Sequence, residues 1–492
     1  MKRNWISVLL LLALTLALLP TAALADGETP TKLTQDNISS NMKLATGSYK
    51  LMGDISLSGI LNIGAVNPYV RATVTLDLNG HTLTGAADLN YTLWINQYSE
   101  LTIIDSSKTG SGKVISQNGT AVMIDANASF TLKSGEISNG VAVGGGVYSN
   151  TPSTLTMDGG RVTGGVNVTD NSKMELKAGT VDGIQLKNSA CTLYANGGTV
   201  TGPSEFYGTV RQKENTAGTV FEGAVTSMLG GEVITGLGMK NSPYELTTAA
   251  ELKAFRDYVN SADPNHRYNT ACAVLESDID LENADWTPIG IGSELYNGKP
   301  PYTGTFDGKG YTIKNLNVNR NTDAGLFGYV DGGTIRNLTV SGSVRNSTNS
   351  ATGGIAGEAN GGTFENCANL CDVKGGITGG IIGFANNTNY DLIVRDCYNA
   401  GKITSTTGSS VGGIIGSCPG TALSTISNCY NAGEVTKKGN GVGTVGAIVG
   451  SNYATVNNCY YLDGTGLNSV GYNYGTVTKT EPKSIREFAD GT

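Results

Sequence analysis

The segment Gly379-Gly-Ile-Ile-Gly383, followed by Val394-Arg-Asp-Cys397 and Ile403, contains the pattern that decides the fold. Its apolar residues form short runs rich in β-branched side chains, and glycine or a short polar residue stands beside each run. Short apolar runs bounded by such residues predict strands rather than helices. The segment therefore predicts several short strands joined by tight corners.

The same pattern recurs along the C-terminal half of the chain. Glycine-rich blocks begin at residues 324, 353, 379, 412 and 446, and a second kind of block ends at residues 338, 367, 397, 429 and 459. Six residues after the first four of these ends stand Val344, Val373, Ile403 and Val435. The spacing inside the repeat is constant while the linking segments vary in length, as expected where strands stack and loops lie outside.

A shorter repeat occupies the N-terminal half. Four units end at Ile137, Val162, Val181 and Val200, which are 25, 19 and 19 residues apart. Each unit has an alternating apolar and polar strand, a glycine corner, and a β-branched residue that starts the next strand. Residues 76–83 and 101–104 are looser versions of the same unit.

Short strands repeating every 19 to 34 residues predict an all-β protein, specifically a right-handed parallel β-helix. A helical solenoid is disfavoured because glycine and β-branched residues make poor helices. A propeller would need longer units of about 40–50 residues. We therefore expect two β-helical modules, stacked or in tandem, with one capping helix.

The domain boundaries follow from the repeats and from the N-terminus. Residues 1–25 read as a signal peptide, because a basic start precedes an apolar run and Ala23-Leu24-Ala25 matches a cleavage site. We expect an N-terminal module over 26–236, a linker with the capping helix over 237–265, and a second module over 266–492 that continues beyond the chain end. No later apolar run reaches membrane-spanning length, so no membrane span is expected in the mature chain.

Two helices are predicted outside the repeats. The first covers Tyr244 to Val259, with Thr248-Ala-Ala-Glu251 as a capping box and an apolar stripe behind it, and we expect it to cover the first coil of the second array. The second begins at Ser484-Ile-Arg-Glu487.

The composition narrows the possible functions. Glycine accounts for 69 of 492 residues, and the formal net charge is −8. We attribute the glycine to the repeated corners, where a positive φ or a close backbone approach is needed. With no basic patch, nucleic acid is not expected as a partner. With only two histidines, His81 and His266, a histidine-rich metal site is excluded, and we interpret both as turn or surface residues.

One acidic segment is a candidate metal site. Asp278, Asp280, Glu282 and Asp285 form the densest acidic cluster and could hold calcium together with backbone oxygens. The favoured interpretation is a strand followed by a polar loop, with Ile279 and Leu281 facing the core. The glycine run 144–146 is interpreted as a corner rather than a phosphate loop, because no Lys-Ser/Thr follows it.

The cysteines and tyrosines form columns in the repeat. The chain has eight cysteines, at positions 191, 272, 367, 371, 397, 418, 429 and 459, of which Cys367, Cys397, Cys429 and Cys459 share one repeat position. We favour a buried column of thiols; disulfides between neighbouring coils and, less so, a metal site are the alternatives. Tyr398, Tyr430 and Tyr460 follow directly and are either outward strand positions or part of a glycan-binding face.

The second array resembles a known family. Trp286-Thr-Pro-Ile-Gly290, Gly304-Thr-Phe-Asp-Gly308 and the repeated glycine blocks are similar to bacterial surface proteins with the GLUG motif, over roughly residues 242–487. The N-terminal array resembles the pectin-lyase-like β-helix class more loosely. The resemblance implies an extracellular stalk or adhesive surface and implies no catalytic residue.

These observations lead to a functional hypothesis. We expect a secreted, non-enzymatic, adhesin-like or structural protein of the bacterial cell surface, without a catalytic residue, cofactor or metal, whose partners are glycans or surface proteins. A polysaccharide lyase or glycoside hydrolase is the first alternative, although the expected sets of carboxylates with a basic residue, or of paired aspartates, are not evident. The accessory region of a larger secreted peptidase is the second.

Overall fold

The computed structural model describes residues 29–38, 43–64, 71–144, 151–211, 218–229, 231–261, 268–292, 300–386, 390–419, 424–439 and 441–490. The chain divides into two compact units, residues 1–226 and 227–492. This division falls before residue 237, so the segment expected to hold the linker and its helix belongs to the second unit. The predicted signal peptide and His266 lie outside the described residues.

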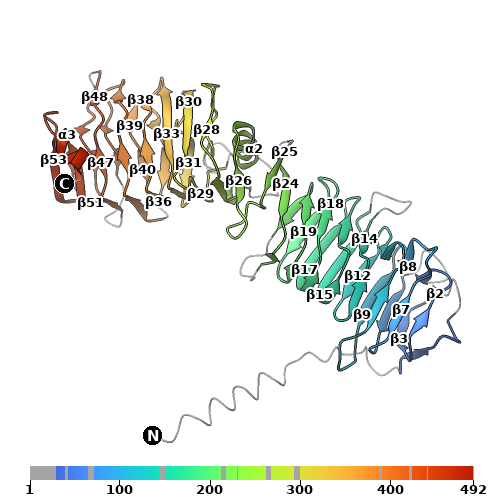
Figure 1. Ribbon diagram of the computed structural model, residues 1–492. Helices are drawn as coiled ribbons and strands as arrows, with labels where there is room; N and C mark the ends of the chain where they lie inside the picture. The colour runs from blue at the N-terminus through green and yellow to red at the C-terminus, as the bar shows by residue number, and fades with distance from the viewer. Residues whose placement is uncertain are drawn as a thin grey trace, which may run out of the picture. The chain divides into compact units, whose positions relative to one another are not determined.

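The first unit consists of strands in long parallel sheets (Figure 1). Its largest sheet has fifteen strands: β1 (Thr31–Leu33), β3 (Gly47–Leu51), β4 (Ile55–Ser56), β6 (Thr73–Asp77), β7 (Thr82–Thr84), β9 (Glu100–Ile104), β10 (Lys113–Ile115), β12 (Ser129–Leu132), β13 (Glu136–Ser138), β15 (Thr154–Val162), β17 (Lys173–Val181), β19 (Thr192–Ala195), β20 (Thr199–Val200), β22 (Thr209–Arg211) and β23 (Val220–Phe221). The other strands are β2 (Lys43–Leu44), β5 (Leu61–Ile63), β8 (Tyr91–Ile95), β11 (Thr120–Ile124), β14 (Val141–Val143), β16 (Val166–Val168), β18 (Ile184–Leu186), β21 (Ser204–Phe206) and β24 (Val225–Leu229), the last of which includes the division between the units.

The predicted repeat of the first unit is confirmed in its register. Ile137, Val162, Val181 and Val200, which end the four sequence units, are consecutive Cα partners in parallel strands. All four side chains are buried. The corner glycines of the same units, at positions 135, 160, 179 and 198, have φ between +69° and +89°, a region that side chains with a Cβ rarely adopt. The sequence repeat therefore corresponds to one strand-and-corner unit that pairs with the next.

The second unit contains three groups of strands. Its longest group comprises β25 (Glu232–Thr235), β26 (Tyr244–Leu246), β27 (Ala273–Leu275), β28 (Ile279–Asp280), β29 (Thr305–Asp307), β30 (Thr312–Arg320), β32 (Thr334–Arg336), β33 (Thr339–Asn346), β36 (Gly362–Glu365), β37 (Ala368–Asn369), β38 (Asp372–Gly375), β41 (Leu392–Arg395), β42 (Tyr398–Asn399), β43 (Ile403–Ser405), β46 (Thr425–Ser427), β47 (Tyr430–Asn431), β48 (Val435–Lys437), β51 (Thr455–Leu462) and β53 (Thr476–Lys483). A six-stranded sheet has β31 (Phe327–Asp331), β35 (Ala356–Asn360), β40 (Ile382–Asn386), β45 (Ile415–Cys418), β50 (Val449–Asn452) and β52 (Val470–Asn473). A four-stranded sheet has β34 (Ala351–Gly353), β39 (Ile377–Gly379), β44 (Val411–Gly412) and β49 (Val445–Gly446).

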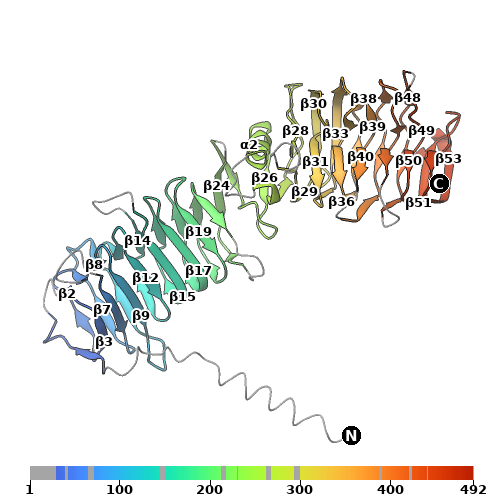
Figure 2. The same cartoon turned by 180° about the vertical axis from the view of Figure 1, so that it is seen from behind.

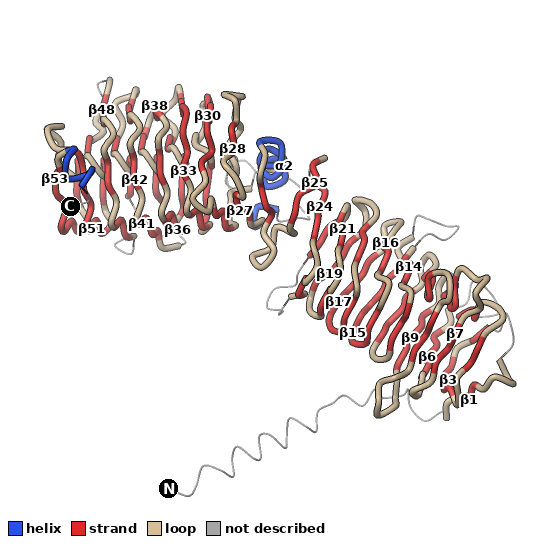
Figure 3. The backbone as a smooth tube through the Cα atoms, in the orientation of Figure 1, coloured by secondary structure: helices blue, strands red, loops and turns tan. Residues whose placement is uncertain are grey.

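Within the six- and four-stranded sheets of the second unit the strands lie side by side in the order in which they occur along the chain, and neighbours come from successive repeats (Figures 1 and 2). Val344, Val373, Ile403 and Val435, which the sequence places at one repeat position, are consecutive parallel partners. One apolar cluster extends through the unit from Leu229 to Val470. The long parallel sheets and few helices confirm the all-β class (Figure 3).

The predicted capping box of the first helix is confirmed, but its predicted start is wrong. Helix α2 (Ala249–Val259) begins after Thr248, whose side chain accepts a hydrogen bond from Glu251 N while the Glu251 carboxylate accepts one from the Thr248 backbone. Residues 244–246 instead form β26, because Tyr244 and Leu246 alternate inward and pair with β27. Phe255 of α2 packs edge-on against Tyr302 in the core of the second unit.

The second unit also contains two short helical elements: a 3-10 turn, η1 (Tyr268–Thr270), and helix α3 (Ile485–Asp490). Helix α3 confirms the start predicted at Ser484, because the Ser484 hydroxyl and the Glu487 carboxylate exchange hydrogen bonds with each other's backbone N–H.

Candidate functional site

The acidic side chains near β28 are bonded to separate partners on β30 and do not converge on one point. Ile279 is buried and Asp278 and Asp280 point outward, which confirms the strand interpretation. Asp278 contacts Lys314 Nζ at 2.7 Å, and this contact lowers the pKa of its carboxyl. Asp280 accepts hydrogen bonds from Glu282 N and Asn315 Nδ2, both at 2.8 Å.

Asp285, the last acidic residue of the segment, is held by an arginine. Both carboxylate oxygens of Asp285 contact the Arg320 guanidinium, at 2.9 and 3.0 Å, and this lowers the pKa of Asp285. The side chains of β30 thus engage three of the four acidic residues separately. In the described part of the chain, no group of three or more His, Cys, Asp or Glu side chains is placed to hold a metal ion.

His81 lies in a turn, as interpreted from the sequence. Its N–H donates to Leu78 O at 2.8 Å, and its Nδ1 lies 3.6 Å from the exposed Asp54 carboxylate. Gly144 has φ +92°, in keeping with a corner, whereas residues 145 and 146 lie outside the described residues.

The four aligned cysteines form the predicted buried column. Each is fully buried as a free thiol, and the backbone N–H of Cys367 donates to Cys397 Sγ at 3.4 Å, which places the two neighbours one repeat apart. Each thiol also donates to a carbonyl, such as Cys429 Sγ to Ser427 O at 3.2 Å. Burial raises the pKa of Cys397 and Cys429 well above the ordinary thiol value. Such thiols are poor nucleophiles.

We expect all eight cysteines to be unreactive in the folded protein and reactive after unfolding, because all are buried free thiols. Titration with a thiol reagent at pH 8 checks this: the native protein should give close to zero equivalents, and the protein unfolded in denaturant without reductant should give eight. A value below eight after unfolding would show that disulfides form, contrary to the thiol column.

A second buried column was not foreseen. Asn369, Asn399 and Asn431 stand two residues after three of the column cysteines, and we refer to these three residues as the asparagine ladder. Asn369 Nδ2 donates to Asn399 Oδ1, and Asn399 Nδ2 donates to Asn431 Oδ1, both at 2.7 Å. Each amide also bonds backbone groups two residues ahead, for example Asn399 Nδ2 to Gly401 O at 2.9 Å. Buried amides satisfied in this way specify the register between repeats.

Of the three tyrosines that directly follow the column cysteines, Tyr398, Tyr430 and Tyr460, the first two are stacked. The rings of Tyr398 and Tyr430 lie 4.9 Å apart and nearly parallel, at 2°. Phe488 of α3 packs on Tyr430, and Lys483 Nζ lies 5.4 Å from the Tyr460 ring centre. All three tyrosines are half-buried, so these rings pack against their neighbours and are only partly available to a ligand.

A more exposed aromatic group lies at the last strand of the six-stranded sheet. Tyr453, Tyr472 and Tyr474 are 37%, 46% and 62% exposed, and the rings of Tyr453 and Tyr474 stack at 4.8 Å. Tyr472 and Tyr474 are separated by one residue in sequence, and their hydroxyls are hydrogen-bonded to each other. Tyr453 and Tyr474 directly follow the partner residues Asn452 and Asn473, and this shared repeat position was the signal that could have identified the stacked pair.

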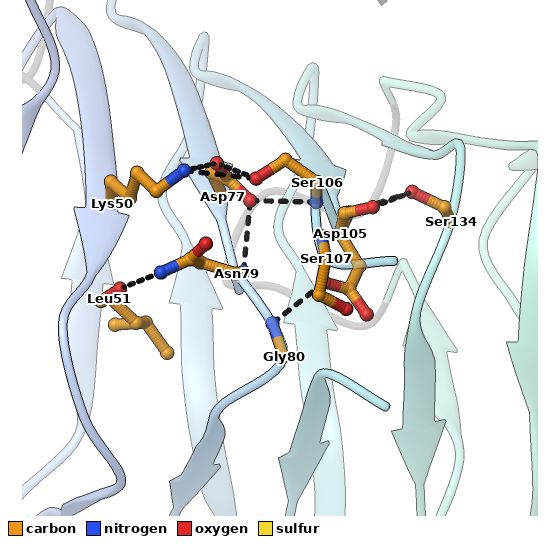
Figure 4. Close-up of polar contacts among 9 residues, drawn as sticks. All are labelled: Lys50, Leu51, Asp77, Asn79, Gly80, Asp105, Ser106, Ser107 and Ser134. Carbon is orange, nitrogen blue, oxygen red and sulfur yellow. Dashed lines mark hydrogen bonds and ion pairs between the residues drawn. The ribbon is translucent and has the colours of Figure 1, made fainter. Parts of the chain in front are cut away.

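A buried carboxylate connects three successive strands of the first unit (Figure 4). Asp77 contacts Lys50 Nζ at 3.1 Å and accepts hydrogen bonds from the Ser106 hydroxyl at 2.6 Å and from Asn79 N at 2.9 Å. Burial acts to raise the pKa of Asp77, but the hydrogen bonds from Ser106, Lys50 and Asn79 together hold it below the ordinary value. Lys50 Nζ also donates a hydrogen bond to the Ser106 hydroxyl at 3.0 Å, so the lysine, the serine and the carboxylate form one network.

The neighbouring Asp105 has a similar structural role. Its carboxylate accepts a hydrogen bond from Gly80 N at 2.7 Å, and the residue is also bonded to Ser134, whose hydroxyl accepts from Asp105 N at 2.7 Å (Figure 4). The carboxylate accepts a further hydrogen bond from Gly112 N at 2.7 Å. Together these bonds tie the corners of adjacent repeats.

Replacing Asp77 by asparagine is expected to lower the stability at pH 7 by about 1–3 kcal/mol, because a charged acceptor of several hydrogen bonds is lost. The folded pKa lies below the unfolded value near 3.8, so this contribution is present above pH 5 and is lost as the pH falls below 3.8. Urea unfolding of both proteins at pH 7, 5 and 3 measures it, with the exposed Asp88→Asn as the control. An equal loss at pH 3 and pH 7 would contradict the assignment.

Comparisons with known proteins give partial similarities. No family model matches the chain. The chain is 31% identical over 154 residues to halomucin of Haloquadratum walsbyi, which covers 29% of this chain and 2% of halomucin. It is 32% identical over 111 residues to a protein of Evansella cellulosilytica named "Putative Gly-rich membrane protein", which covers 22% of this chain and 12% of that protein. The chain thus spans a small part of these curated relatives.

One solved structure is similar. It is the crystal structure titled as that of "a putative immunoglobulin A1 protease" from Bacteroides ovatus, with 22% identity and a TM-score of 0.40 over 52% of this chain and 88% of that chain. Among the described residues of the present protein, no helix is long and apolar enough to cross a membrane.

Proposed function

We propose that the chain is a secreted, non-enzymatic protein of the bacterial cell surface, built from two right-handed parallel β-helices, the second of which carries GLUG-type repeats. It acts as an adhesin-like or structural stalk whose surface binds glycans or surface proteins. The observation that carries the proposal is the parallel, in-register pairing of equivalent positions one repeat apart in both units.

The interior of the repeats supports a structural role. The polar side chains in the two buried columns of the second unit all have hydrogen-bond partners within the repeats. The asparagine amides bond one another, and the cysteine thiols donate to backbone carbonyls. Stacked uncharged side chains can run through many repeats without the repulsion that stacked charges would meet. The relatives named above, one called halomucin and one called a membrane protein, are compatible with a surface location.

Labelling of intact cells tests the location. We expect an antibody raised against the purified chain to label unpermeabilised cells of the source organism, and external protease to remove the signal while a cytoplasmic marker stays intact. Labelling that requires permeabilisation would contradict a surface location.

Incubation with glycans tests the absence of activity. We expect uronate-containing and host-type oligosaccharides to be recovered unchanged after incubation with the purified chain, whether or not they are retained. Turnover that a single carboxylate substitution abolishes would overturn the non-enzymatic assignment in favour of a lyase or glycoside hydrolase.

A further inference from the structure

A surface depression of about 390 Å³ lies over the first residues of β9, β12 and β15 in the first unit. Arg71, Tyr98, Glu100, Asn127, Ser129 and Thr154 line it. Its size is at the lower end of the range for small-molecule sites, which suits a ligand of one or two sugar rings.

The floor of the depression is one column of outward strand positions. Glu100, Ser129 and Thr154 are consecutive parallel partners, so three successive repeats present a carboxylate and two hydroxyls side by side. Neighbouring strands of a sheet lie about 4.8 Å apart, so these polar groups form a regularly spaced row. Such a row of oxygen atoms can bond several hydroxyls of one ligand.

The wall is formed by the corner that precedes each strand, and Tyr98 is unusual there. Tyr98 has φ +62°, in the left-handed region, where the corners of later repeats hold Asn127 (φ +56°) and Asn171 (φ +62°). Asparagine tolerates this conformation, whereas a bulky aromatic residue in it is strained. The corner itself therefore does not require a tyrosine, and residues held in strained conformations cluster at ligand sites.

The side chains around Tyr98 have complementary chemistry. The tyrosine is 39% exposed, so one part of its ring is available for stacking. The Arg71 guanidinium forms an ion pair with the Glu100 carboxylate, whose second oxygen accepts a hydrogen bond from Thr73 Oγ1 at 3.3 Å. The pair supplies strong donors and acceptors while its charges cancel. An aromatic face beside paired polar groups suits a ring with an apolar face and hydroxyl edges.

We propose that this depression binds a neutral saccharide of one or two rings, with Tyr98 stacked on the sugar and Arg71, Glu100 and Ser129 bonding its hydroxyls. The cancelled charge favours a neutral sugar over a uronate. The proposal deepens the proposed function, on which it rests, by naming the ligand class of one surface of the first unit.

Binding of defined disaccharides to the full mature chain tests the proposal. The probes are cellobiose, lactose, mannobiose and N,N′-diacetylchitobiose, with digalacturonate as the charged comparator, and saturation-transfer NMR and calorimetry are the readouts. We expect at least one neutral disaccharide to bind and digalacturonate to bind at least tenfold more weakly. Absence of binding by every neutral probe, or a preference for digalacturonate, would overturn the proposal.

Three variants locate the binding. Tyr98→Asn installs the residue found at the next corner, so we expect an unchanged or higher melting temperature together with at least a tenfold loss of affinity. Arg71→Ala, at a side chain 69% exposed, should keep the fold and weaken binding severalfold. Tyr207→Ala, at a tyrosine of the first unit that is 43% exposed and lies outside the depression, should bind like the parent chain.

The outcomes separate the two proposals. Unchanged affinity of both Tyr98→Asn and Arg71→Ala would overturn the depression as the site, even where the protein is found on the cell surface. Conversely, a protein that binds a disaccharide through Tyr98 but is absent from the surface of intact cells would retain the site and overturn the proposed location.

Discussion

Replacing Gly413 by alanine is expected to lower the stability of the second unit by about 2–6 kcal/mol. Gly413 faces the asparagine ladder, and an added Cβ would overlap both the Ala447 carbonyl oxygen and the Asn431 side chain. The Ala447 oxygen belongs to the backbone of the next repeat, so it cannot turn aside. Overpacking costs about 1–3 kcal/mol, and displacing a buried, bonded amide costs a comparable amount.

Urea-induced unfolding followed by circular dichroism measures the loss for Gly413→Ala. Gly53→Ala is the control, because no atom lies within 4 Å of its added Cβ and its φ is ordinary; we expect a change within about 0.5 kcal/mol. Equal unfolding midpoints for the two variants would show that the glycine blocks are not required for close approach.

Replacing Asn399 by alanine is expected to cost about 2–4 kcal/mol. The side chain makes four hydrogen bonds: to Asn431 Oδ1 and Gly401 O as donor, and from Asn369 Nδ2 and Gly401 N as acceptor. Alanine leaves part of this buried network unpaired, and each unsatisfied group costs about 1–3 kcal/mol. The same urea measurement applies, with Asn319→Ala at an exposed position of β30 as the control.

Asn399→Asp gives a sharper test of the same ladder. The carboxylate keeps the size of the amide but faces the Asn431 oxygen with an acceptor, and it places a charge in a buried position. We expect Asn399→Asp to be more destabilising than Asn399→Ala at pH 7. At pH 4, where a buried carboxyl is protonated, we expect Asn399→Asp to lose less stability than it does at pH 7. A loss that does not depend on pH would contradict the burial of this column.

Much of the fold could be predicted from the spacing of residues. The ends of the sequence units, such as Val162 and Val181, are partners in the sheets, because a strand that pairs with its counterpart one repeat later must preserve its register. The helix start was misplaced because Tyr244 and Leu246 suit either a helix or a strand, and only pairing with β27 decides between them.

The asparagine ladder could not be read from the sequence, since asparagine is usually an exposed turn residue. Once the ladder is known, the sequence shows a matching pattern. Where the ladder position holds asparagine, as at Asn431, a glycine such as Gly413 faces it. In the last repeat the ladder position holds Tyr461, and the glycine block there has Ala447 instead. The glycines of these blocks have no positive φ, so their role is close approach rather than a corner conformation.

Successive repeats of the second unit stack strand on strand in one direction. Asp307, Arg336, Glu365, Arg395, Ser427, Asn457 and Thr478 are consecutive partners across seven strands. Spin labels placed by genetic encoding, which avoids the native thiols, at Thr478 and in turn at residues 365, 336 and 307 measure the stacking directly by electron–electron resonance. At about 4.8 Å per strand we expect distances of roughly 19, 24 and 29 Å, whereas distances that level off or shorten from 365 to 307 would contradict the stacking.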